Sequence, residues 1–167
     1  MCRVADVAKQ AIYESLILES TNNDKSFLLD FYKLNKLLYI AQGVMLARYD
    51  APMFQETIYA YKCGPYIEEL EFVFFDWNFE LIEKNYEDNI ELPPHVESVL
   101  LEVLCKYGKY NKQELGLITK NQRPWKEAFL DSDNKHAISL DSIKQYFSEN
   151  NIEREFMNEF SYRKETG

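Results

Sequence analysis

The chain has 167 residues, enough for one ordinary domain, and its 46% hydrophobic and 28% charged residues argue against disorder. Its net charge of −9 disfavours direct binding to nucleic acid, because that affinity comes largely from lysine and arginine. No stretch approaches the roughly 20 apolar residues of a membrane span, and the N-terminus lacks the basic start and apolar run of a signal peptide, so we expect a cytoplasmic protein without a membrane segment.

The small number of turn-forming residues, 5 glycines and 5 prolines, favours helices over a turn-rich β sandwich. We therefore predict a mainly α fold, a compact multi-helix single domain with at most a short β element around residues 56–62. Apolar residues at three- and four-residue steps predict a first amphipathic helix over residues 4–18. The polar stretch "ESTNND" is predicted as a loop after it.

The strongest helical pattern in the chain covers residues 30–47, with an alternative start at Phe27. Its apolar residues fall on one face, namely Phe31, Leu34, Leu38, Ala41 and Met45. Gly43 inside this helix costs about 1 kcal/mol relative to alanine, so something must compensate for it. We expect that a neighbouring backbone approaches closely there.

The dipeptide Gly64-Pro65 separates an alternating segment, residues 58–62, from an acidic one. Glycine can take a positive φ and proline is favoured at the first helical position, so we predict that Pro65 begins a third helix that runs to about Trp77. Residues 58–62 are predicted as a short strand or an extended arm. The aromatic run of the third helix is apolar on more than one side, which leaves open whether two layers bury it or part of it is an exposed interface.

Start signals predict four further helices after a surface loop at residues 83–92. These signals are Pro93-Pro94, the capping box of Asn111 and Glu114, Pro124, and Ser139 or Asp141. Gly108 is the predicted stop of the first, and one more amphipathic helix is predicted after Asn150. We divide the chain into a helical domain, residues 1–150, and a C-terminal helical extension, residues 151–167, which packs on the domain or frays in part.

Residues able to carry catalysis or bind metal are few and widely spaced. Cys2, Cys63 and Cys105 form no C-x-x-C pair and have no neighbouring histidine, which indicates reduced thiols and no zinc site. His95 and His136 are predicted as surface residues that make no case for catalysis. The sequence also lacks the common nucleotide-binding and metal-binding motifs. We therefore expect no catalytic residues, no cofactor and no metal.

Aromatic residues are the distinctive feature of the composition, with 12 tyrosines and 11 phenylalanines. Tyr59, Tyr61 and Tyr66 flank the Gly-Pro dipeptide. Tyrosine gives a large contact area with little loss of entropy, which suits a binding surface. Packing in the core or at its edge is the alternative explanation for most of these rings, and the sequence leaves both open.

Three blocks of this sequence resemble the Panacea-domain proteins, also described as SocA-like antitoxins and as phage-associated or genetic-element proteins. The blocks are "KLNKLLYIAQGVMLA" at residues 33–47, "IYAYKCGPYIEEL" at residues 58–70 and "RPWKEAF" at residues 123–129. They keep the order of the family, and with "ISLDSIKQYF" the resemblance covers most of residues 1–148. The sequence departs from the usual family residues at Asn35, Val44, Tyr61 and Tyr66.

The resemblance implies a mostly helical domain, encoded beside toxins on bacterial chromosomes and mobile elements, that neutralises its cognate toxin by binding. No catalytic residues come with the family. The motif residues expected to form the scaffold are Leu34, Leu38, Tyr39, Gln42, Gly43, Gly64 and Pro65. For Tyr61, Tyr66 and Trp125, contact with the partner and packing inside the domain are both open.

Our leading hypothesis is an antitoxin that binds one protein toxin encoded next to it, with the acidic charge attracting a basic toxin surface. The alternative is a proteolytic adaptor that delivers a toxin to a protease of the ClpXP type, because one member of the family acts in this way. An enzyme that works through His95 or His136 is a third hypothesis. The sequence leaves the oligomeric state open.

Overall fold

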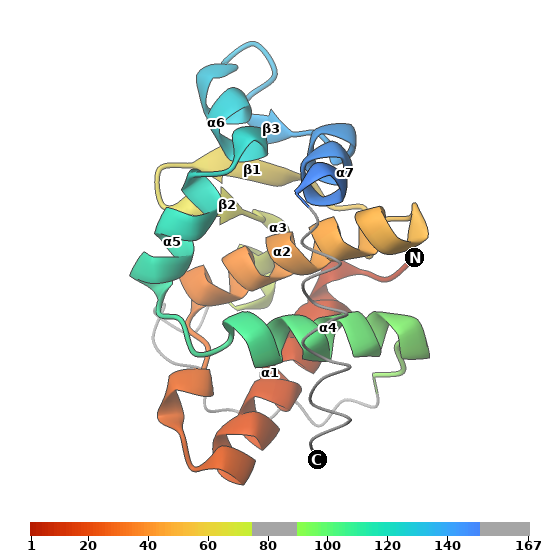
Figure 1. Ribbon diagram of the computed structural model, residues 1–167, viewed down its shortest axis with the longest axis vertical. Helices are drawn as coiled ribbons and strands as arrows, with labels where there is room; N and C mark the ends of the chain where they lie inside the picture. Colours follow the sequence, from red (N-terminus) through yellow and green to blue (C-terminus); the bar gives the residue numbers. More distant parts are fainter. Residues whose placement is uncertain (75–89, 151–167) are drawn as a thin grey trace.

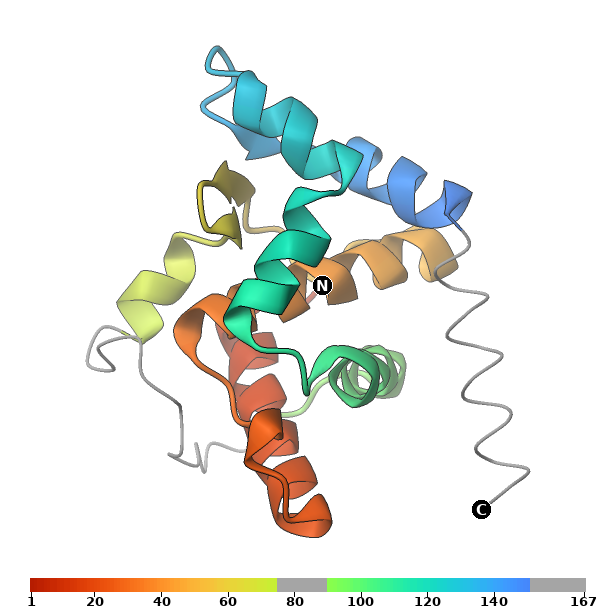
Figure 2. The same ribbon diagram turned by 60° about the vertical axis from the view of Figure 1, so that its left-hand side comes forward.

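The helix α2 (Phe31–Tyr49) lies at the centre of the computed structural model, which describes residues 1–74 and 90–150. It packs against α4 (Pro94–Tyr107) on one side and against α7 (Leu140–Glu149) and a small sheet on the other (Figure 1). The remaining described helices are α1 (Val4–Asn22), the 3-10 turn η1 (Lys25–Phe27), α3 (Glu69–Val73), α5 (Lys112–Lys120) and α6 (Arg123–Leu130). Figure 2 shows α5 and α6 following one another from α2 towards the sheet.

The central helix begins at a side-chain cap and is buried along most of its length. The carboxylate of Asp30 accepts a hydrogen bond from the N–H of Lys33 at 2.8 Å, which satisfies one of the free amides at the helix start. Every residue from Lys33 to Leu46 is buried. The predicted helix over residues 30–47 is therefore confirmed, and it ends at Tyr49.

The first helix is longer than predicted. α1 ends at Asn22 and not at residue 18, so most of the predicted loop "ESTNND" is helical. Asn22 Nδ2 donates a hydrogen bond to the Leu18 carbonyl at 2.8 Å, and Asn23, with φ 50°, ends the helix in the left-handed conformation. Serine, threonine and asparagine are tolerated here because this last turn is on the surface.

Gly64-Pro65 lies in a strand, so the prediction that Pro65 begins a helix is wrong. β1 (Ile58–Tyr61) pairs antiparallel with β2 (Gly64–Tyr66), and Lys62-Cys63 is the two-residue turn between them. Gly64 follows this turn with φ +120°, a conformation that other residues rarely adopt. β2 is an edge strand, the position in a sheet that tolerates proline.

The β element is a three-stranded antiparallel sheet in the order β2-β1-β3. The predicted strand within residues 58–62 is confirmed, and the alternative of an unpaired arm is wrong. β3 (Ala137–Ile138) pairs with the other edge of β1, where no strand was predicted from the sequence. Two residues give too short a pattern to be recognised as a strand. The mainly α fold is confirmed.

The start signals in the second half of the chain are confirmed. Pro93 precedes α4, and Pro124 lies in the first turn of α6. Asn111 and Glu114 form both hydrogen bonds of the capping box of α5, at 2.9 and 3.0 Å. Ser139 is the cap of α7, since its hydroxyl accepts a hydrogen bond from the N–H of the third following residue at 3.1 Å.

Several predictions fall on residues outside the described ranges. They concern most of the surface loop at residues 83–92 and the C-terminal extension at residues 151–167. The third helix, α3, begins at Glu69 and ends at Val73, so it starts later and ends earlier than the predicted helix from Pro65 to about Trp77. In residues 1–74 and 90–150, no helix has both the length and the apolar character needed to cross a membrane.

Gly43 allows α2 and α7 to pack closely. A Cβ atom at this position would lie 2.5 Å from three ring atoms of Phe147, which is itself 1% exposed. The expectation of a close backbone is therefore wrong, because an aromatic side chain occupies the space. The ring of Phe147 also packs edge-on against Tyr39, with 5.8 Å between ring centroids.

The Gly43→Ala substitution should lower the free energy of unfolding by up to about 2 kcal/mol. Overpacking costs about 1–3 kcal/mol, and the better helix propensity of alanine offsets about 1 kcal/mol of it. Urea denaturation followed by circular dichroism measures the change. Adding Phe147→Leu should recover part of the loss, because the smaller side chain makes room.

Gly116→Ala in α5 is the matched control, since a Cβ atom there would meet its nearest neighbours at 3.6 Å, an ordinary contact distance. Its free energy of unfolding should stay the same or rise. A Gly43→Ala protein as stable as the Gly116→Ala protein would contradict the packing argument.

Candidate functional site

The structure brings together the three residues proposed from sequence for partner contact. The rings of Tyr61 and Tyr66 are stacked, with 4.4 Å between centroids and an angle of 9°. The indole N–H of Trp125, on α6, donates a hydrogen bond to the Tyr61 carbonyl at 3.0 Å. Residues from two distant parts of the sequence thus meet where the hairpin touches α6.

The three side chains differ in exposure, and this separates their roles. Tyr61 is exposed at 37%, and Trp125 is half-buried. Tyr66 is only 5% exposed, and its ring packs edge-on against Phe31 with 5.6 Å between centroids. Tyr61 and Trp125 are therefore available for contact, whereas Tyr66 supports the Tyr61 ring from beneath.

A groove of about 640 Å³ runs beside these rings, and we call it together with them the aromatic surface. Its lining includes Tyr61, Tyr66, Phe129 and His136. Phe129 stacks on Trp125 with 4.6 Å between centroids. Apolar and aromatic walls of this kind favour the burial of an apolar side chain from another molecule.

The exposed start of α3 places carboxylates next to the aromatic surface. The hydroxyl of Tyr61 donates a hydrogen bond to Glu68, and that of Tyr66 donates one to Glu71. Burial is the main cause that raises the pKa of both tyrosines, and the hydrogen bonds to these carboxylates raise it further. Both phenols therefore stay protonated at neutral pH and remain donors.

The two histidines lie on different elements. His95, at the start of α4, is exposed, as predicted, and its ring packs against Tyr49 with 5.2 Å between centroids. His136 precedes β3 and is half-buried in the groove, so its prediction as a surface residue is only partly correct. Its Nδ1 lies 3.2 Å from the carbonyl of Ala128.

The polar motif residues of α2 hold loops in place. The Gln42 amide accepts a hydrogen bond from the N–H of Met53 at 2.6 Å and donates one to the Phe54 carbonyl at 2.8 Å. The Tyr39 hydroxyl donates to the side chain of Gln122 at 2.8 Å. Both Tyr39 and Gln42 are 0% exposed. These contacts give the two residues structural roles.

Asn35 fixes the far end of the hairpin. Its side-chain oxygen accepts a hydrogen bond from the N–H of Ile67 at 2.7 Å, and its amide donates to the Phe31 carbonyl at 2.8 Å. The apolar motif residues Leu34 and Leu38 are fully buried in the same helix. The hairpin that carries Tyr61 is therefore positioned from α2.

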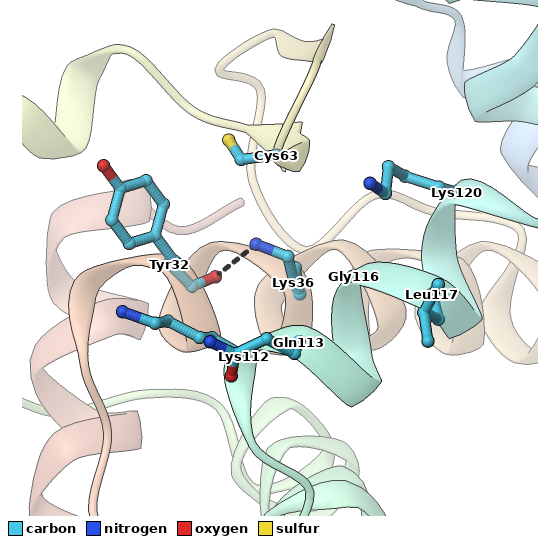
Figure 3. A pocket seen from close by; sticks show the side chains of 8 residues that line it. All are labelled: Tyr32, Lys36, Cys63, Lys112, Gln113, Gly116, Leu117 and Lys120. Carbon is cyan, nitrogen blue, oxygen red and sulfur yellow. Dashed lines mark hydrogen bonds between the residues drawn. The ribbon is translucent and has the colours of Figure 1, made fainter.

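Two buried lysines of α2 were missed by the sequence reasoning. Lys33 Nζ donates hydrogen bonds to the carbonyls of Ser26 and Leu28 at 2.6 and 3.1 Å. Lys36 Nζ donates to the Tyr32 carbonyl at 3.2 Å and lies at a second pocket, which Figure 3 shows. Their position among leucines in the motif block was the available signal.

The family model described as "Antitoxin SocA-like, Panacea domain" matches residues 34–126. The chain belongs to this family. The resemblance inferred from the three sequence blocks is thus confirmed, and family membership implies a toxin as the general class of partner. No curated protein and no solved structure matches the chain. The roles of particular residues of this Panacea domain therefore rest on its own geometry.

Gln42→Leu should lower the free energy of unfolding by about 2–4 kcal/mol, because it leaves buried backbone groups of Met53 and Phe54 without partners. Urea denaturation measures the loss. Gln145→Leu replaces an exposed glutamine on α7 and should change the free energy by less than about 0.5 kcal/mol. Equal effects of the two substitutions would contradict the structural role of Gln42.

Because Lys33 is buried, the free energy of unfolding should increase as the pH rises from 8 to about 9.5. Burial lowers the pKa of Lys33 from 10.5 to about 8, so in this window unfolding takes up a proton and a higher pH opposes it. The free energy of unfolding should gain about 1–2 kcal/mol relative to the Lys33→Met protein. Parallel slopes for the two proteins in urea titrations at several pH values would exclude this effect.

Proposed function

We propose that the protein neutralises its toxin by binding it directly, with the aromatic surface as the contact site. The observation that carries this proposal is the exposed ring of Tyr61, stacked on Tyr66 at the edge of a groove of about 640 Å³. Membership of an antitoxin family supplies the class of partner. Exposed aromatic rings beside an apolar groove are typical of protein interfaces.

The rings are held in place before any partner arrives, which favours binding. Tyr61 is fixed by the stack on Tyr66, by the hydrogen bond of its hydroxyl to Glu68, and through its carbonyl by the indole of Trp125. A side chain that is already ordered loses little conformational entropy on association. Trp125 is fixed in turn by its stack on Phe129.

The charge next to the aromatic surface indicates what kind of toxin surface it fits. Glu68, Glu69 and Glu71 are exposed at the start of α3, and the whole chain carries a net charge of −9. Such a field attracts a basic partner and speeds its association. We propose a toxin that presents an apolar or aromatic anchor flanked by lysine or arginine.

We also propose that neutralisation needs no catalytic step. The arrangement of the histidines supports this, since neither His95 nor His136 is hydrogen-bonded to a carboxylate among the described residues. A general base needs a partner that orients it, and an exposed ring on α4 and a ring against a backbone carbonyl do not provide that arrangement. Binding alone is therefore the simpler account.

Tyr61→Ala with Trp125→Ala should abolish rescue of bacteria that express the toxin encoded by the adjacent gene. Loss of two interface anchors typically weakens binding by more than about 100-fold. Growth after induction and pull-down of the tagged protein are the two measurements. The wild-type chain should restore growth and retain the toxin in the pull-down, and the double variant should do neither.

The matched control is Tyr13→Ala, which removes an exposed tyrosine of α1 that lies at 43% exposure. This variant should rescue growth like the wild type. Rescue by the double variant, or loss of rescue by Tyr13→Ala alone, would contradict the assignment of the contact surface. A toxin that disappears from the cells without forming a complex would instead favour the proteolytic adaptor.

A further inference from the structure

A second pocket, of about 490 Å³, lies between α2, the turn of the hairpin and α5 (Figure 3). Three lysines line it, Lys36 from α2 and Lys112 and Lys120 from α5. The Tyr32 ring and Leu117 give it apolar surface. None of its described lining residues is acidic, although the chain as a whole carries a net charge of −9.

Lys36 is the buried positive group of this pocket. The residue is 1% exposed, and its Nζ donates a hydrogen bond to the Tyr32 carbonyl at 3.2 Å. No carboxylate forms an ion pair with it within residues 1–74 and 90–150. Buried ammonium groups are normally paired with an anion, because burial without one is costly.

The other two lysines add to this positive charge. Burial is the largest cause that lowers the pKa of Lys36; the charges of Cys63 and Asp30 raise this pKa, and the charges of Lys120 and Lys112 lower it. Lys112 Nζ and Lys36 Nζ lie 5.6 and 5.5 Å from the centroid of the Tyr32 ring. Lys120 Nζ is held on the other side by the Lys62 carbonyl at 3.3 Å. Three ammonium groups that could bind an anion therefore belong to the lining of one pocket.

Gly64 makes room for the Lys36 side chain, and Gly116 lies at ordinary contact distance from it. A Cβ atom at Gly64 would lie 3.0 Å from Lys36 Cε, closer than side chains normally pack. A Cβ atom at Gly116 would lie 3.6 Å from the same carbon. The hairpin and α5 therefore enclose the lysine stem and leave its ammonium group at the pocket, as Figure 3 shows.

We propose that this pocket binds the phosphate group of a small organic phosphate. Three lysines around one pocket match the charge of a phosphate, which approaches −2 near neutral pH, better than the single charge of a carboxylate. The Tyr32 ring and the Leu117 side chain offer apolar contact to the organic part. The volume lies in the range of roughly 300–1,000 Å³ that is typical of small-molecule sites. The pocket shares Tyr32 and Cys63 with the groove of the aromatic surface, so it lies next to the proposed toxin contact.

Isothermal titration calorimetry with adenosine monophosphate, inorganic phosphate and adenosine tests the proposal. Adenosine monophosphate should bind the full-length protein at millimolar concentration or below, inorganic phosphate should compete with it, and adenosine should not bind. Lys112→Gln with Lys120→Gln should weaken the binding by about tenfold or more. Both lysines are on the surface side of the pocket, so circular dichroism should show an unchanged fold.

Lys25→Gln with Lys126→Gln is the matched control, since it removes two exposed lysines outside the pocket and changes the net charge equally. Equal binding by the two double variants would overturn the proposal, because it would indicate unspecific attraction. Absence of heat up to about 10 mM of both phosphates would also overturn it. The Lys112→Gln, Lys120→Gln protein could also bind adenosine monophosphate as the wild type does and yet fail to capture the toxin. That result would indicate that the pocket binds an acidic side chain of a protein, and the phosphate proposal would be wrong.

Discussion

The structure depends on a single constraint, the burial of α2 on all sides. A helix without a solvent-facing side cannot place its polar side chains in water, so each of them must find a partner inside the protein. Asn35, Tyr39 and Gln42 meet this requirement by bonding to segments outside the helix. Through these hydrogen bonds the polar residues of the motif attach the hairpin, the loop before it and the start of α6 to the central helix.

The same constraint explains how charge is distributed in an acidic protein. Lys33 uses backbone carbonyls of the segment before α2 to satisfy its buried ammonium group. Lys36, three residues later on the helix, lies between the hairpin turn and α5. Positive charge is therefore concentrated beside one face of the hairpin, while the carboxylates that follow the hairpin lie beside its rings. Two chemically different surfaces thus meet at one short hairpin.

Much of the helical framework could be predicted because helix starts depend on local chemistry. Pro93, Asn111 and Ser139 act within their own turns, and no distant contact is needed to recognise them. Gly64-Pro65 was misread because a glycine-proline pair fits both a helix start and a strand after a tight turn, and only pairing with β1 decides between them. The ring of Phe147 against Gly43 and the convergence of Tyr61 with Trp125 likewise depend on contacts between residues far apart in the sequence.

The close packing of Gly43 against Phe147 also bears on how this family can change over evolution. Position 43 and position 147 share one volume, so a larger residue at the first is compatible with the fold only beside a smaller residue at the second. The two positions lie in different helices and at different ends of the domain sequence. If the two positions vary together among relatives, an alignment of sequences would reveal the contact between α2 and α7 without a structure.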